Sequence, residues 1–276
     1  MSDEPREELQ AGERAEAAAS DAADVASGET EEAGRKAAAD GHFERVMVVA
    51  AHPDDPEFGF GATVAKMSDE GAAVTYVICT DGSQGGEDPS VPDEELTATR
   101  YAEQRAAAEV LGVKEVVFLG FRDGHLAPNV ELRRAIAREI RRYRPELVLT
   151  HSPLRAIDVP IGASHPDHLA VGEATLAAVY PDARNPRAYP ELLQEGLEAY
   201  KVKEVWLPGF LSADLYVDAS RYVDRKIEAI SCHRSQFEKP GMEPDMPGKW
   251  TRERMRQAGE SSGYEYAEAY KRLETG

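Results

Sequence analysis

The chain has 276 residues, of which 42% are hydrophobic and 30% charged. That length and apolar content suit one large domain or two small ones with a proper core. The 51 acidic and 32 basic residues give a formal net charge of -19, which argues against nucleic-acid binding and against docking on anionic lipid. No stretch approaches the ~20 apolar residues of a membrane span. The acidic N-terminus lacks a secretory signal and the two cysteines form no disulfide framework, so we expect a cytoplasmic protein.

The first 42 residues differ in composition from the rest of the chain. They hold 12 acidic and 4 basic residues and almost no large aliphatic side chains. Such a segment cannot bury enough apolar surface to offset the entropy of ordering. We therefore expect residues 1–42 to form a solvated acidic tail and residues 43–276 to form the folded domain.

From residue 43 the pattern alternates between strand and helix. Apolar runs predict buried strands over 46–50, 74–79, 115–119 and 147–150. Helices are predicted over 57–69 and 99–111, each followed by a glycine, and over 132–143, where an apolar stripe ends before Pro145. Alternation of this kind predicts an α/β, Rossmann-like three-layer fold with a mostly parallel sheet. The segments 182–201 and 236–262 are irregular and are expected to shape the rim of a pocket.

Two short clusters of histidine and aspartate carry the chemistry. His52-Pro53-Asp54-Asp55-Pro56-Glu57 directly follows the first predicted strand, and His165-Pro166-Asp167-His168 precedes a predicted helix. Ligands bind beyond the carboxyl ends of parallel strands, where both clusters can meet. Carboxylates crowded in a dry site repel one another, so a divalent metal is the economical counter-charge. His52, Asp55 and His168 would supply the two nitrogens and one carboxylate common at catalytic zinc, which leaves Asp54 free for proton transfer.

Other interpretations of these residues were weighed. His-Pro-Asp-Asp alone is ordinary turn chemistry, but the two clusters hold three of the seven histidines. A nicotinamide-binding domain would need a glycine-rich loop after the first strand, where this chain is acidic. A serine hydrolase would need Gly-x-Ser-x-Gly, which the sequence lacks.

The paired clusters resemble those of the PIG-L/LmbE-like N-deacetylases. Further similarity lies in the following motifs: Thr80-Asp81-Gly82, Arg100-x-x-Glu103, Phe121-Arg122-Asp123-Gly124, and Lys226 with His233-Arg234-Ser235-Gln236. The resemblance covers about residues 44–237, and more weakly 264–270. It implies a Rossmann-like fold and a zinc-dependent hydrolase that removes acetyl groups from N-acetylglucosamine moieties. The substrate would be a small molecule that carries such a moiety. It also favours a homo-oligomer.

Carried over residue by residue, the resemblance implies one zinc ion per subunit on His52, Asp55 and His168, with Asp54 as general base. It implies that His165 stabilises the transition state as a cation whose pKa Asp167 raises. Arg100 and Asp123 would contact the substrate, although Arg100 could instead pair with Glu103. His233 would face its own site or a neighbouring subunit's, or else cap a helix or pack near Cys232. His151 is either an outer partner of the metal site or structural.

Three alternative functions remain open. The enzyme could cleave the amide of a thiol-cofactor or other glucosaminide conjugate. A metal-dependent phosphoester hydrolase would need two metal ions and more ligands. A metal-dependent sugar-binding protein would not need Asp54 as a spare base.

Overall fold

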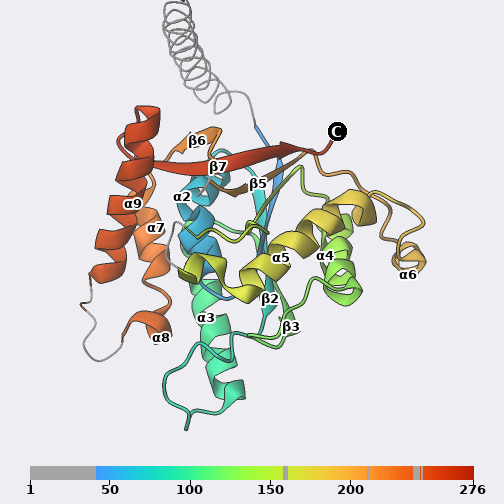
Figure 1. Cartoon of the computed structure of the whole chain (residues 1–276), viewed down its shortest axis with the longest axis horizontal. Coiled ribbons are helices and arrows are strands. Elements are labelled where there is room, and N and C mark those ends of the chain that lie inside the picture. Colours follow the sequence, from blue (N-terminus) through green and yellow to red (C-terminus); the bar gives the residue numbers. More distant parts are fainter. Residues whose placement is uncertain (1–41, 158–160, 210–211, 239–242, 244) are drawn as a thin grey trace, which may run out of the picture.

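The structure is a computed structural model that describes residues 42–157, 161–209, 212–238, 243 and 245–276. The expected acidic tail therefore lies, apart from His42, outside the described residues. Within them, one sheet has the strand order β3-β2-β1-β4-β5-β7-β6 (Figure 1). Its strands are β1 (Arg45–Ala50), β2 (Ala73–Thr80), β3 (Glu115–Phe121), β4 (Leu147–Thr150), β5 (Glu204–Pro208), β6 (Leu215–Asp218) and β7 (Ala267–Glu274).

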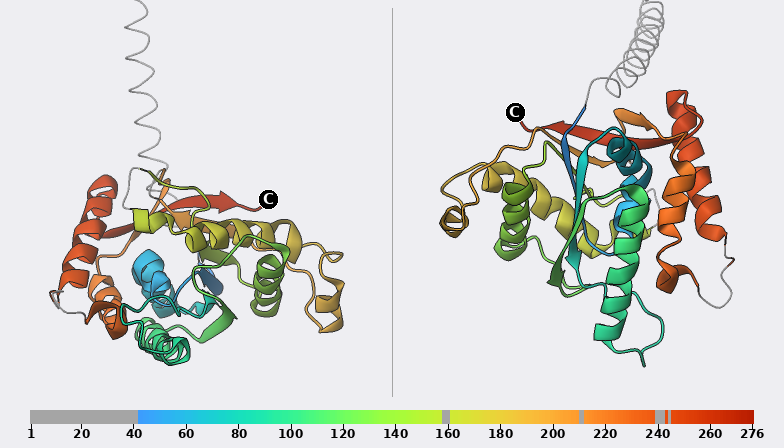
Figure 2. Two further views of the ribbon diagram at one scale, coloured as in Figure 1. Left: turned by 60° about the horizontal axis from the view of Figure 1, so that its bottom comes forward. Right: turned by 180° about the vertical axis from the view of Figure 1, so that it is seen from behind.

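The five strands from β3 to β5 are parallel, and β7 pairs antiparallel with both β5 and β6. Helices cover both faces of the sheet (Figures 1 and 2). One face carries α2 (Asp55–Asp69), α3 (Asp93–Leu111) and α7 (Val223–Ile230), with α9 (Met246–Ser262) packed beside α7 and β7; the other carries α4 (Val130–Tyr143) and α5 (Pro166–Ala177). Short elements complete the chain: η1 (Ile161–Ser164), η2 (Ala178–Ala183), α6 (Pro190–Gln194) and α8 (Arg234–Phe237). Among the described residues, no helix combines the length and the apolarity needed to cross a membrane.

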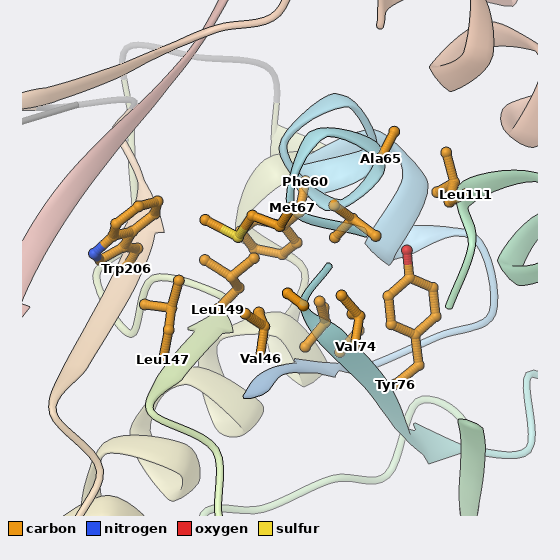
Figure 3. Packing of buried hydrophobic residues seen from close by; sticks show 14 of the residues in the cluster. Val46, Phe60, Ala65, Met67, Val74, Tyr76, Leu111, Leu147, Leu149 and Trp206 are labelled. Carbon is orange, nitrogen blue, oxygen red and sulfur yellow. The ribbon is translucent and has the colours of Figure 1, made fainter. Parts of the chain in front are cut away.

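Alternate residues of β1 build the two cores. Val46, Val48 and Ala50 face the cluster under α2 and α3, seen in Figure 3. Met47 and Val49 face the cluster under α4 and α5. All five are essentially inaccessible to solvent, as expected for a central strand covered on both faces. This is why the strand is a continuous apolar run rather than an alternating one.

The predicted α/β fold with a mostly parallel sheet is confirmed. The fourth strand has the predicted bounds and the other elements extend the predicted ranges. The helix expected from residue 99 begins at Asp93, because three acidic residues fill its first turn, where they interact favourably with the helix dipole. Strands β5, β6 and β7 and helix α9 were not predicted.

The strand order places a topological switch between β1 and β4. From β1 the chain moves outward to β2 and β3, whereas β4 continues to β5 on the other side. In open α/β sheets a crevice forms at such a point, outside the carboxyl ends of the strands. His52 follows β1 and His151 follows β4, so both lie at this crevice.

Candidate metal centre

Asp55 lies at the centre of the site, among three imidazoles. Its Oδ1 lies 3.0 Å from Nε2 of His168. Its Oδ2 lies 3.3 Å from Nδ1 of His52 and 3.3 Å from Nε2 of His151, and it accepts a 2.7 Å bond from the backbone N–H of His52. Burial alone would raise the pKa of Asp55, but His168 and His151 lower it well below its usual range. The carboxylate is therefore ionised.

The imidazole of His151 accepts a hydrogen bond from the backbone. The N–H of Ala51 donates to its Nε2 at 3.1 Å. Burial, with the neighbouring His168, lowers the pKa of His151 to about 4, so the ring is neutral. Its ring stacks on that of His168 with centroids 4.2 Å apart. These contacts place His151 against His168, and its outer or structural role stays a prediction.

The donor set fits a zinc ion. Within the described residues, three groups could hold a metal: His52 with His165 and His168, Asp55 with His151 and His168, and His52 with Asp123 and Asp167. The first group shares His168 with the second and His52 with the third, whereas the second and third share no residue. Imidazole nitrogen and carboxylate oxygen are typical zinc ligands. The predicted ligands His52, Asp55 and His168 all lie in this cluster.

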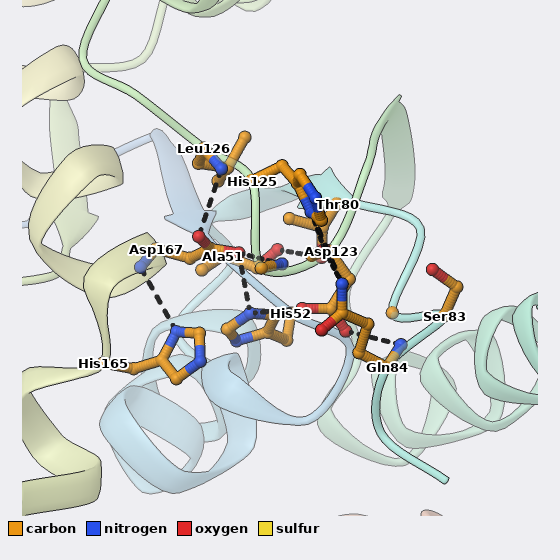
Figure 4. Close-up of polar contacts among 12 residues, drawn as sticks. Ala51, His52, Thr80, Ser83, Gln84, Asp123, His125, Leu126, His165 and Asp167 are labelled. Atoms are coloured by element: carbon orange, nitrogen blue, oxygen red, sulfur yellow. Dashed lines mark hydrogen bonds and ion pairs between the residues drawn. The ribbon is translucent and has the colours of Figure 1, made fainter. Parts of the chain in front are cut away.

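The other side of the His52 ring faces two buried carboxylates. Its Nε2 lies 3.1 Å from Oδ1 of Asp123 and 3.3 Å from Oδ2 of Asp167 (Figure 4). Asp167 also accepts bonds from the backbone N–H groups of Gly124 (2.8 Å) and Leu126 (3.2 Å). Burial opposes ionisation of Asp167, yet the bonds from His52 and Gly124 lower its pKa. A carboxylate on the far nitrogen fixes the orientation of a metal-binding histidine, and His52 has two.

The relation between His165 and Asp167 differs from the expectation. The Asp167 carboxylate is directed to His52 and to Gly124, and only its backbone N–H reaches His165, donating to Nδ1 at 3.2 Å as His165 caps α5. Burial lowers the pKa of His165, and His52 and His168 lower it further. Asp167 opposes this and raises the pKa of His165, in the expected direction, although its effect is smaller. In the neutral ring the proton is on Nε2, because Nδ1 accepts the N–H of Asp167.

Asp54 has a strained backbone. Its φ of 106° and ψ of -32° lie in a region that residues other than glycine rarely adopt. Its Oδ2 accepts a 3.2 Å bond from Nη2 of Arg100. Burial raises the pKa of Asp54 to about 6, and the nearby Arg100 opposes that rise. Asp54 is thus a carboxylate poised to exchange a proton near neutral pH.

Two expected substrate contacts turn out to support the loops of the site. Arg100 is 3% exposed. Besides Asp54, it donates to the carbonyl oxygens of Gly82 (2.9 Å) and Pro53 (2.6 Å). It does not pair with Glu103, which accepts bonds from Ser235. Asp123, 5% exposed, faces His52 and accepts from the backbone of Gln84. Both side chains therefore make contacts within the protein, and their contact with a substrate stays a prediction.

His233 is fully buried, so as placed it reaches neither a substrate nor a neighbouring subunit. Its Nε2 lies 3.0 Å from Oε2 of Glu57, a carboxylate that Gln104 also contacts. Sequence reasoning missed Gln104 altogether. The one available signal was its position four residues after Arg100, on the same face of a helix.

The chain is similar to several known proteins. The family model described as PIG-L: GlcNAc-PI de-N-acetylase matches residues 47–179. A diacetylchitobiose deacetylase of Thermococcus kodakarensis is 33% identical over 225 residues, which cover 82% of this chain and 81% of that protein. A probable N-acetyl-alpha-D-glucosaminyl L-malate deacetylase of Bacillus anthracis is 32% identical over 199 residues, covering 70% and 81%. The solved structure of N,N'-diacetylchitobiose deacetylase from Pyrococcus horikoshii, in complex with an inhibitor, superimposes with a TM-score of 0.76 at 29% identity, covering 90% of this chain and 92% of that one. The chain therefore belongs to the PIG-L family.

Proposed function

We propose that this protein is a zinc-dependent hydrolase that removes the N-acetyl group from a substrate of the N-acetylglucosamine type. The observation that carries the proposal is Asp54. This carboxylate has a raised pKa and a strained backbone, and it lies next to the Asp55 cluster without belonging to any of its candidate ligand groups. A binding site alone has no use for such a group.

His52, Asp55 and His168 would hold the ion, one per chain. A divalent ion held there would polarise a carbonyl oxygen and lower the pKa of a nearby water. Asp123 and Asp167 keep the His52 ring in place from its far nitrogen. His151, bonded to the backbone of Ala51, packs flat against His168.

The protein's own residues would then move the protons. Asp54, with a pKa of about 6, is largely ionised at neutral pH and takes a proton from the attacking water. The same group can return that proton to the leaving amine nitrogen, so that acetate and a free amino sugar result. His165 is held with Nδ1 as an acceptor. Its Nε2–H is therefore available to donate to the carbonyl oxygen as negative charge develops there.

The relatives support the acetamide of a glucosamine unit as the reacting group, since those named above are deacetylases of diacetylchitobiose and of a glucosaminyl malate. An amide of a larger glucosaminide conjugate is the second candidate, because such a substrate carries the same reacting group. A phosphoester hydrolase would need two metal ions, so the number of ions bound per chain distinguishes it from a deacetylase that uses one.

Acetate release tests the proposal directly. The protein is stripped with a chelator, given one equivalent of zinc, and incubated with N-acetylglucosamine, diacetylchitobiose and a glucosaminide conjugate. We expect zinc-restored acetate from at least one of them. Tight binding of one zinc without acetate from any would count against the deacetylase and leave the amide conjugate or the binding role. Failure to bind zinc would contradict the proposed metal site itself.

Two variants assign the roles within the site. Asp54→Asn should keep one zinc per chain while kcat falls by roughly 10²–10⁴. His168→Ala should lose the zinc itself, whereas the same change at His42, which is exposed, should not. Near wild-type turnover by Asp54→Asn would show that the base is another group.

A further inference from the structure

The strained turn at Asp54 must be held by its surroundings. An aspartate with a φ of 106° relaxes to a common conformation unless neighbouring contacts prevent it. The backbone carbonyl oxygen of Asp54 accepts from the N–H groups of Glu57 (3.1 Å) and Phe58 (3.3 Å) at the start of α2. One side chain acts on its backbone N–H, which donates to Oε1 of Gln104 at 2.9 Å. Arg100 contacts the adjoining carbonyl of Pro53 and the Asp54 carboxylate. Gln104 is thus the side chain that fixes the direction of the Asp54 amide.

The side-chain amide of Gln104 is itself oriented by a carboxylate. Its Nε2 lies 3.0 and 3.1 Å from the two oxygens of Glu57. The backbone N–H of Asp54 can only donate, so the C=O end of Gln104 must face Asp54 and the NH2 end must face Glu57. His233 contacts Oε2 of the same carboxylate at 3.0 Å. The order of contacts is therefore His233, Glu57, Gln104 and Asp54.

These contacts join segments that are far apart in the sequence. Glu57 lies on α2, Gln104 on α3, and His233 precedes α8. The side chains of all three are completely buried. Buried ionic and polar networks of this kind are often no more stable than apolar residues of the same volume. A role in placing Asp54 explains why polar groups occupy these positions.

We propose that Gln104, oriented by Glu57 and His233, is a positioning residue that holds Asp54 in the strained conformation in which it acts as a base. The inference rests on the proposed function only for the role of Asp54. The geometric part, that Gln104 holds the backbone, stands by itself.

A double-mutant cycle tests the catalytic part. Gln104→Met keeps the volume and removes both hydrogen bonds, and we expect kcat to fall about 10- to 100-fold, with KM within about twofold and one zinc still bound. In the Asp54→Asn background the same change should alter the residual kcat by less than about twofold, because the group that Gln104 positions is already lost. An equal fall in both backgrounds would show a merely structural role and overturn the proposal. Gln194→Met, at an exposed position on α6, is the matched control and should leave kcat unchanged.

A second variant covers the case in which Gln104→Met fails to fold. Combining it with Glu57→Leu and His233→Leu removes the buried carboxylate and imidazole that would otherwise lose their partners, and replacing bonded partners together with apolar groups is tolerated far better. This variant should fold and still have a low kcat; full activity would overturn the proposal. Its crystal structure should show Asp54 with a negative φ, and a φ that stays near the present value would refute the geometric part even if the wild-type protein released no acetate. Absence of acetate from the wild type would count against the proposed function alone.

Discussion

Replacing Gly172 with alanine tests how closely α5 must approach the loop after β4. Gly172 is buried on α5, one turn after His168. A Cβ added there would lie 2.6 Å from the carbonyl oxygen of His151, 2.8 Å from the nitrogen of Pro153 and 2.8 Å from the carbonyl carbon of Ser152. All three neighbours are backbone atoms, so none can rotate aside. The helix or the loop must move instead.

The size of the effect follows from these distances. Ordinary contact begins at 3.4 Å, so the closest pair must separate by 3.4 - 2.6, or about 0.8 Å. Overpacking of this kind costs about 1–3 kcal/mol, and the better helix propensity of alanine returns about 1 kcal/mol. Because the colliding atoms are rigid, we expect a net loss of about 1–2 kcal/mol, which lowers Tm by roughly 2–8 °C. The same shift moves His168, which lies 3.0 Å from Asp55, beyond the ~0.5 Å tolerance of a metal site.

Calorimetry of the chelated protein and a zinc competition assay measure the two effects separately. Gly59→Ala on α2 is the matched control, because a Cβ there meets nothing within 4 Å and should stabilise the protein by about 0.5–1 kcal/mol. We expect Gly172→Ala to be less stable than the wild type and to bind zinc at least tenfold more weakly. Equal or higher stability with unchanged zinc affinity would refute the close packing of α5 on residues 151–153.

The remaining predictions concern Asp54 and the buried pair Lys226–Glu268. Asp54→Gly should be about 1 kcal/mol more stable than Asp54→Ala in denaturant unfolding, because both lose the carboxylate and only alanine keeps the strain; equal stability would mean that the backbone is not strained. Burial raises the pKa of Asp54 to about 6, so its contribution to stability is fully present below the unfolded value near 3.9 and is lost as pH rises through about 6. The metal-free wild type should therefore lose stability relative to Asp54→Asn between pH 5 and pH 7.5, and a constant difference would contradict the shift. Lys226→Met leaves the Glu268 carboxylate, 2.6 Å from Nζ of Lys226, without its buried counter-charge and should cost about 3–5 kcal/mol, measured as a fall in Tm.

The central half of the fold could be predicted because its signals are local. A parallel strand covered on both faces must be apolar throughout, and Val46 to Ala50 is such a run. The strands at the other edge carry no such signal. Strand β7 includes Lys271, Arg272 and Glu274, and Arg272 pairs with Glu204 of β5 at 2.6 Å. A strand stabilised by a partner 68 residues away cannot be recognised from its own pattern.

The site, like the fold, has a part that could be predicted from the sequence and a part that could not. The cluster of His52, Asp55 and His168 could be predicted, since strand order alone brings the ends of β1 and β4 together. The direction of the Asp167 carboxylate could not, because it depends on the backbone N–H groups of Gly124 and Leu126. Proximity in sequence suggested that Asp167 serves His165. In the structure its carboxylate contacts His52, and its charge still raises the pKa of His165.

The buried carboxylates and the strained backbone of the site also argue for a function. Five carboxylates of the site or its support are wholly or largely buried: Asp54, Asp55, Glu57, Asp123 and Asp167. Each needs its own histidine, arginine, amide or backbone donors, and one has a backbone conformation that costs stability as well. Charge is buried elsewhere too, as in the pair Lys226–Glu268, but among the described carboxylates only Asp54 combines burial with a positive φ. Selection for stability would remove that combination, so its presence at the switch point supports the proposed role of Asp54.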